Sequence, residues 1–401
     1  MDSSSPNSGL AALTFALALS QFFRSCLAVM APELQHDLQL TPAGFGALSS
    51  CFFLAFGAAQ IAVGVAFDRF GVGFPTRFLL ALGVASATLL ACAPNGPTAM
   101  LAQAGLGLAC APVFMGLMHY ASEQLSPQRY ASFINRANAV GMLGALCATA
   151  PLGWAVHTVG WRPIIGVAAL CMALACLGVW RTVHDKGHAH AQQESVATAL
   201  RSSTRLLNMP ALWTLIPLCM AMAAGTTFRN AWGGPYLASV FGLHAGPRGL
   251  ALAVLSVGAF CAAMALPWLV RLLSMRETVL GWSCATVVAG MALAAWPGAG
   301  LVGNVALLTM LGTLGVLHPL VMSHGRLLLS PEMRGRGLGI LNTFVFLGSA
   351  LTSWTFGLIA DAGQRANTSA TTIYAQIFAC ATVLAAVGVL TYALSPRMPR
   401  S

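Results

Sequence analysis

Two arginines stand alone inside long apolar stretches of this sequence, and they are its most unusual candidates for chemistry. Arg24 lies in the run Leu10–Ala31 and Arg229 in the run Met220–Leu237, and neither run contains another charged residue. Runs of this length can cross a membrane, where a charge near the middle costs roughly 3 kcal/mol. Arginine keeps its proton, so each guanidinium group needs a partner that is negatively charged or accepts hydrogen bonds.

The carboxylates of the chain do not supply that partner. All 10 aspartates and glutamates can be placed in loops or at the ends of apolar segments. A guanidinium group binds phosphate or carboxylate through two parallel hydrogen bonds, so an anionic substrate is the natural candidate. The alternative is structural, because a membrane arginine can also bond helix carbonyls or extend along a cavity wall. The presence of two such arginines favours the anion.

Further polar side chains are expected at the depth of the arginines. The predicted substrate site consists of Arg24, Arg229, Gln21, Gln60, Asn138, Asn342, Tyr120 and Trp232. The amide side chains can equally serve to join helices. His318 is the candidate for proton coupling, because imidazole titrates near neutral pH. We expect no metal site and no cofactor, since the 17 methionines and 11 cysteines are scattered and mostly lie in apolar runs.

The elements that must position these residues are membrane helices. Hydrophobic residues make up 57% of the 401 residues and charged residues only 7%, which excludes a water-soluble globule. The expected fold class is therefore all-α and integral to the membrane, with twelve transmembrane helices. The segments lie near residues 10–31, 45–67, 78–93, 98–120, 137–158, 163–180, 211–233, 249–270, 278–296, 302–324, 338–360 and 372–394.

The basic residues predict how the chain is oriented. Of the 20 lysines and arginines, 15 fall on the side of the N-terminus, two lie within segments, and Arg162, Arg248 and Arg365 are placed in loops on the opposite side. The positive-inside rule then puts both termini in the cytoplasm, and we expect a multi-pass protein of the inner, cytoplasmic membrane. The formal charge of +10 reflects this topology and does not indicate nucleic-acid binding.

The two halves of the chain repeat each other. At an offset of 204 residues Leu125–Gly153 matches Leu329–Gly357 without gaps, and Leu40 falls on Leu243 at an offset of 203. Arg24 and Arg229 are 205 residues apart, which makes them near equivalents in depth. The expected domains are a six-helix bundle over 1–180, a cytoplasmic linker over 181–209 and a second six-helix bundle over 210–401.

The stretch GVAFDRFGVGFPTR at 64–77, after the second segment, resembles a signature of the major facilitator superfamily, Gly-x-x-x-Asp-Arg-x-Gly followed by basic residues. Val72 and Gly73 stand where the family usually has those basic residues, and Arg77 follows them. The stretch VGWRP at 159–163 likewise resembles the start of the sixth helix in many members, whereas Gln103 replaces the arginine that begins their helix 4 signature. The resemblance implies two pseudo-symmetric bundles and a loop that latches the halves together in one state. The residues expected to form this latch are Gly64, Asp68, Arg69, Gly71 and Arg77.

The arginine pair resembles that of the organophosphate:phosphate antiporters, and the stretch 24–53 is similar to these and to the anion:cation symporters. This resemblance implies a secondary active transporter, not an enzyme, that moves a phosphorylated or carboxylated metabolite by alternating access. Anion exchange and proton coupling both remain open. The competing function is proton-driven efflux of drugs or siderophores, which needs a large apolar cavity. The expected partners are an anionic small molecule and the lipid bilayer, and the carrier is expected to be a monomer.

Overall fold

The computed structural model describes residues 6–184, 208–330 and 333–396, and the regular elements in those ranges are all helical. Twelve spans in them are long and apolar enough to cross a membrane. This number confirms the count expected from the sequence, and the chain is a multi-pass membrane protein. Residues 185–207, most of the expected linker, lie outside the described ranges.

The first half contributes six of the spans. Its fifth span consists of two helices that meet at Ala148 and Thr149. The helices are α1 (Pro6–Asp37), α2 (Pro42–Phe70), α3 (Gly73–Ala91), α4 (Gly96–Gln124), α5 (Pro127–Cys147), α6 (Ala150–Val159) and α7 (Trp161–Thr182). Several of them extend beyond the apolar runs, because their polar ends reach past the hydrocarbon layer.

The second half contributes the other six spans, and two of these are segmented. The seventh span contains a π-helical stretch, and the tenth contains a 3₁₀ turn before a histidine–proline pair. The elements are α9 (Pro210–Trp213), α10 (Ile216–Ala221), α11 (Ala223–Thr227), η1 (Phe228–Trp232), α12 (Gly233–Phe241), α13 (Ala245–Leu272), α14 (Met275–Ala295), α15 (Leu301–Gly312), η2 (Thr313–Leu317), α16 (His318–Leu328), α17 (Arg334–Arg365) and α18 (Ala370–Ala393).

Polar caps and glycines set the ends of the helices. The Thr41 hydroxyl accepts a hydrogen bond from the Gly44 N–H at 3.1 Å, and the Asn95 side chain accepts one from the Thr98 N–H at 3.1 Å. Both bonds satisfy N–H groups that a helix start leaves free. Gly71 ends α2 with φ 74° and ψ −176°, a conformation that only glycine adopts readily.

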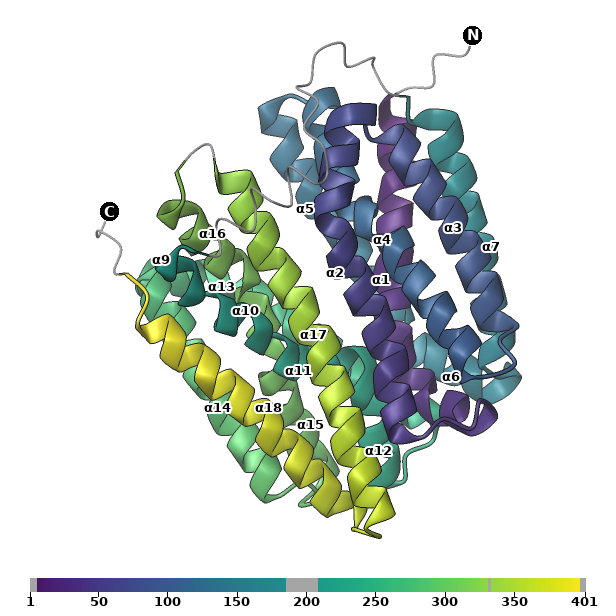
Figure 1. Cartoon of the computed structure of the whole chain (residues 1–401), viewed down its shortest axis with the longest axis vertical. Helices are drawn as coiled ribbons and strands as arrows, with labels where there is room; N and C mark the ends of the chain where they lie inside the picture. Colours follow the sequence, from purple (N-terminus) through teal and green to yellow (C-terminus); the bar gives the residue numbers. More distant parts are fainter. Residues whose placement is uncertain (1–5, 185–207, 331–332, 397–401) are drawn as a thin grey trace.

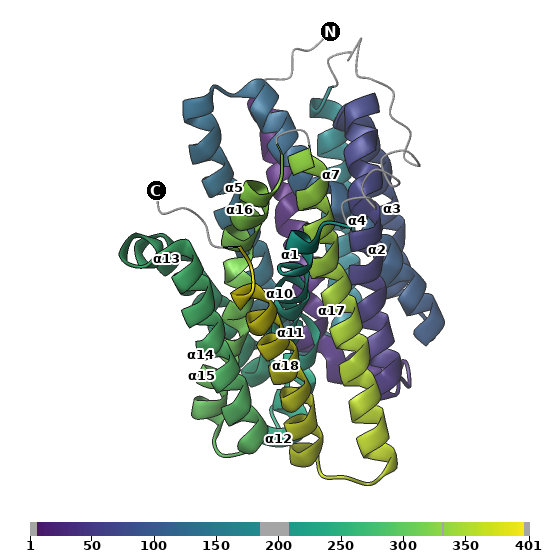
Figure 2. The same ribbon diagram turned by 60° about the vertical axis from the view of Figure 1, so that its left-hand side comes forward.

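The two halves form two helix bundles that lie side by side (Figure 1, and turned by 60° in Figure 2). We call the end at which α1 begins and α2 finishes the linker end, and the opposite end, at which α1 finishes and α2 begins, the distal end. Two long helix pairs join the bundles, α2 along α17 and α6 along α13, and α1 also packs against η1 and α12. The sequence repeat maps α2 onto α13 and α6 onto α17, so the two pairs are related by the pseudo-twofold axis.

Glycine–glycine crossings close both of these pairs near the distal end. A Cβ atom on Gly46 would lie 2.7 Å from a carbonyl oxygen of α17 and 3.0 Å from Gly357 Cα. A Cβ on Gly249 would lie 2.7 Å from the carbonyl oxygen at the start of α6 and 3.2 Å from Gly153 Cα. The repeat offsets place Gly46 on Gly249 and Gly153 on Gly357. The same close contact therefore occurs twice, and it needs glycine at all four positions.

Candidate substrate site

The helices that carry the two arginines cross directly beside them. Ser25 Oγ donates a buried hydrogen bond to Asn230 Oδ1 at 3.4 Å, which joins α1 to η1. One turn further on, Gly234 lets α12 approach so closely that a Cβ there would lie 1.5 Å from the Ala28 carbonyl oxygen. The π-helical η1 widens the turn that bears Arg229. Arg24 and Arg229 are thereby brought to one depth at the interface of the halves.

Among the described residues, no acidic side chain pairs with either arginine. The helices that bear them, α1 and η1, pack against each other. The Nε atom of each is buried and has no hydrogen-bond partner among the described residues. Within the described ranges neither arginine takes part in an ion pair. Two positively charged groups without an acidic partner among the described residues therefore lie at this interface.

Arg24 also contacts an aromatic pair that spans the two halves. Its Cζ lies 4.9 Å from the ring centroid of Phe56 on α2 and 5.4 Å from that of Phe346 on α17. The two ring centroids are 4.3 Å apart. Each of the two cation–π contacts contributes roughly 0.5–2 kcal/mol, which together offsets part or all of the cost of about 3 kcal/mol of placing the charge here, but the rings carry no negative charge. The aromatic pair thus holds Arg24 in place without neutralising it.

A chain of polar side chains crosses between the halves next to Arg24. Gln60 Nε2 donates to the Phe56 carbonyl at 3.4 Å, and Gln60 Oε1 accepts from Asn342 Nδ2 at 3.3 Å. Asn342 Oδ1 in turn lies 3.2 Å from His318 Nε2. Because this oxygen can only accept, we assign the proton of neutral His318 to Nε2, which leaves Nδ1 able to take up another. Gln60, Asn342 and His318, all three predicted from the sequence, therefore form one network.

Trp232 lies on the distal side of the arginines, between the two halves. It is 2% exposed, and its Nε1–H donates to Ser353 Oγ at 3.0 Å. Its ring packs edge-on against Phe45 at 5.5 Å and Phe356 at 6.2 Å between centroids. The N–H donor of the ring is used by Ser353, and the assignment of Trp232 to the substrate site stays a prediction.

The three remaining predicted residues lie on α4, α5 and α1, and only Gln21 is within one turn of Arg24 along a helix. Tyr120 packs against α1 at Gly9, where a Cβ would meet its hydroxyl at 2.7 Å. Gly9 is fifteen residues, or about 22 Å of helix, from Arg24. Asn138 is exposed on α5, although its repeat equivalent belongs to the polar network. Gln21 lies on α1 against Gly141 of α5, with its Cγ 3.6 Å from the Cβ position there.

The residues of the expected latch lie at the linker end. Gly71 supplies the turn after α2, and Arg69 is exposed with its Cζ 5.0 Å from the Phe70 ring centroid. Gly64 has open space around its Cβ position. Arg77 donates to the Val183 carbonyl at the end of α7, a contact within the first half. The Asp68 side chain lies outside the described residues, so the latch stays a prediction.

An ion pair that the sequence did not indicate joins the halves at the distal end. Arg248 was expected in a solvated loop, but it lies in the first turn of α13 and is 2% exposed. Its Nη2 donates to Glu33 Oε2 at 2.6 Å and to the Val29 carbonyl at 2.6 Å, and its Nε donates to the same carbonyl at 2.9 Å. The sequence offered one hint of this buried position: Arg248 directly precedes Gly249, which the repeat places on Gly46.

The described residues contain no cluster of three or more histidines, cysteines, aspartates or glutamates able to hold a metal ion. The candidate site is therefore built from arginine, amide, imidazole and aromatic groups. Such groups can bind and release a small molecule, but no nucleophile with a general base lies among them.

Comparisons with known proteins agree with this architecture. The sequence model of the Major Facilitator Superfamily matches residues 13–353. No curated protein matches the chain. A point mutant of the nucleoside transporter NupG is similar in structure, with a TM-score of 0.78 at 13% identity over 96% of this chain and 100% of that chain. A bacterial homolog of the human lysosomal transporter Spinster, inward-facing and unoccupied, gives a TM-score of 0.78 at 15% identity over 98% of both chains.

Proposed function

Because the chain belongs to the major facilitator superfamily, we propose that this secondary transporter carries a small organic anion, phosphorylated or carboxylated, by alternating access. One observation carries the proposal: Arg24 and Arg229 lie on α1 and η1, which pack against each other where the halves meet, and no acidic group pairs with either within the described ranges. A bound anion would remove the repulsion between them and so favour closure of the halves around it. Each chain contains both arginines, so a monomer is sufficient.

The direction of opening follows from the placement of basic residues. We assign the linker end, with both termini, to the cytoplasm of a cell with an inner membrane, because most lysines and arginines fall on that side. The distal end then faces outward and is closed by the glycine crossings and by Arg248 with Glu33. Similarity to an inward-facing neighbour supports the same conformation.

Proton coupling, if the transporter uses it, would run through His318. A protonated imidazole would add a third positive charge beside Arg24, and this is unfavourable until an anion is bound. The proton and the anion would therefore bind together, which is the thermodynamic basis of symport. The alternative, exchange of one anion for another, needs no titrating group.

The test is a thermal-shift screen of the purified protein against phosphorylated and carboxylated metabolites, with neutral nucleosides and cationic drugs as comparison ligands. Anions should raise Tm, and Arg24→Gln and Arg229→Gln should abolish that rise. Arg365→Gln is the matched control, because Arg365 is exposed at the distal end of α17 and pairs with Asp361 away from the site. Stabilisation by neutral or cationic compounds alone would overturn the proposal and favour drug efflux instead.

A further inference from the structure

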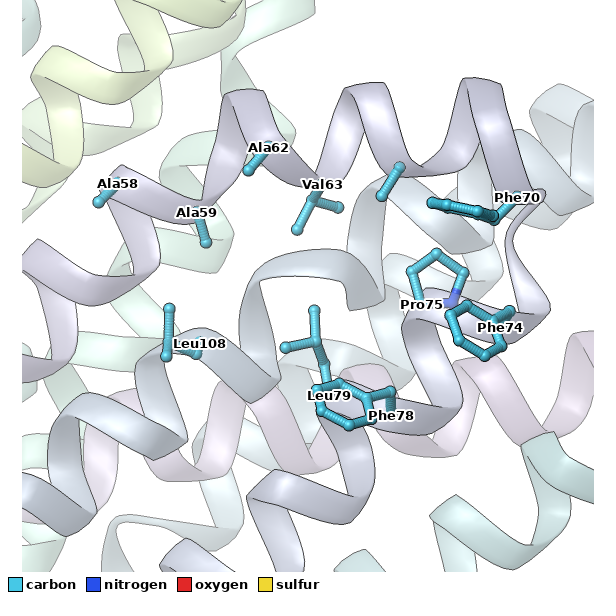
Figure 3. A pocket seen from close by; sticks show the side chains of 11 residues that line it. Ala58, Ala59, Ala62, Val63, Phe70, Phe74, Pro75, Phe78, Leu79 and Leu108 are labelled. Atoms are coloured by element: carbon cyan, nitrogen blue, oxygen red, sulfur yellow. The ribbon is translucent and has the colours of Figure 1, made fainter. Parts of the chain in front are cut away.

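An apolar groove lies on the first half, away from the arginine site. It has a volume of about 470 Å³ and lies between α2 and α3, with Leu108 of α4 at its floor. Figure 3 shows Phe70, Phe74 and Pro75 at one end and Ala58 with Leu108 at the other. All of its lining side chains are apolar, so it offers nothing to a charged substrate.

The groove opens towards the membrane. Ala58 and Ala62 are exposed on α2, on a face different from that of Gly46 and Gly57, which contact α17. Phe78 on the opposite wall is 66% exposed. In a membrane-spanning segment such exposed apolar groups face hydrocarbon, so the space between the helices is filled from the lipid.

The dimensions of the groove match one lipid chain of one leaflet. From Ala58 to Phe70 the wall formed by α2 runs twelve residues, or about 18 Å. Half of a bilayer core of about 30 Å is about 15 Å. The groove thus extends from near mid-membrane to the linker end, where α2 finishes.

A positive charge stands at the mouth of the groove. Arg69 is exposed, directly precedes the lining residue Phe70, and holds its Cζ 5.0 Å from that ring. A phosphate headgroup at the membrane surface can pair with this guanidinium while its chain lies along the helix. We propose that the groove between α2 and α3 is a binding site for an anionic phospholipid of the linker-end leaflet, with one acyl chain in the groove and the headgroup on Arg69.

The test uses the full-length protein in vesicles that contain phosphatidylglycerol with a photoactivatable diazirine on one acyl chain. After irradiation, adducts should map to the peptides that line the groove. Ala62→Phe fills the groove and should reduce these adducts at least fivefold, and Ala58→Phe, which fills the other end, should do the same. Ala85→Phe is the matched control, because Ala85 is exposed on α3 but is not among the lining residues.

The headgroup is tested separately. Arg69→Gln should reduce labelling about fivefold, since one arginine near an anionic surface contributes about 1 kcal/mol. Arg271→Gln, at the corresponding exposed end of α13, should not. A phosphatidylcholine probe should label less than phosphatidylglycerol. Unchanged adducts in both groove-filling variants, equal labelling by the two lipids, or equal effects of the two arginine changes would overturn the proposal. The result is independent of which substrate the transporter carries.

Discussion

The ion pair between Arg248 and Glu33 gives the sharpest prediction, because its two members differ in burial. Arg248 is 2% exposed, whereas the Glu33 side chain is 35% exposed. Removing the charge of Glu33 leaves a buried guanidinium group bonded to carbonyls only. Removing Arg248 leaves a carboxylate that water can still reach. We therefore expect Glu33→Gln to weaken the distal contact more than Arg248→Met.

The magnitudes follow from the same burial. Breaking a fully buried pair costs 3–5 kcal/mol, and the partial exposure of Glu33 lowers this to about 2 kcal/mol for Glu33→Gln. That corresponds to a shift of roughly 30-fold in the equilibrium between closed and open distal ends. For Arg248→Met we expect about 1 kcal/mol, or about fivefold.

Spin labels measure this equilibrium directly. Residues 95 and 367 are exposed in distal turns of opposite halves and can be labelled in a background from which the native cysteines have been removed. Double electron–electron resonance should show a longer-distance population that is largest in Glu33→Gln, smaller in Arg248→Met and smallest in the parent. Equal populations in all three proteins, or a larger effect from Arg248→Met, would refute the reasoning.

Three further outcomes are expected. Gly46→Leu should open the distal end in the same spin-label assay, because its Cβ meets a carbonyl at 2.7 Å, whereas Gly64→Leu, with nothing within 4 Å, should not. Asn342→Leu should move the pH midpoint of anion uptake into proteoliposomes, because it removes the side chain that accepts the hydrogen bond of His318. Asn138 is the exposed repeat equivalent of Asn342, and Asn138→Leu should leave that midpoint in place. Gly71→Ala should lower thermal stability by roughly 1–3 kcal/mol, since φ 74° with ψ −176° strains any other residue, and an unchanged Tm would contradict this.

The sequence indicated the architecture because the composition of each segment shows whether that segment can cross the membrane as a helix. A run of about 20 apolar residues must cross the bilayer as a helix to satisfy its backbone, so counting runs gave the twelve spans that the structure contains. The isolation of Arg24 and Arg229 in such runs was visible for the same reason. Their near-equal depth followed from the repeat offset and is consistent with the contact between Ser25 and Asn230.

The fate of the other site residues depended on which way each helix faces and on how the halves meet. Asn138 and Asn342 are equivalent in the sequence repeat, yet only Asn342 joins the network. Asn342 lies on α17, which packs along α2, whereas Asn138 is exposed on α5. Trp232 has the polar group of a ligand but is buried between helices of both halves. The sequence gives the position of a side chain along its helix, but it does not give the residues of other helices that surround the side chain.

Sequence alone determined that this chain crosses the membrane twelve times, that it is duplicated, and that it carries two arginines without nearby acids along the chain. Tertiary structure alone decided that Arg248 meets Glu33, that Gly46 meets Gly357, and that a polar chain links the halves beside Arg24. The physical reason is that insertion into a bilayer depends on the composition of each segment separately. Contacts between the halves depend on the packing of residues about 200 to 310 positions apart.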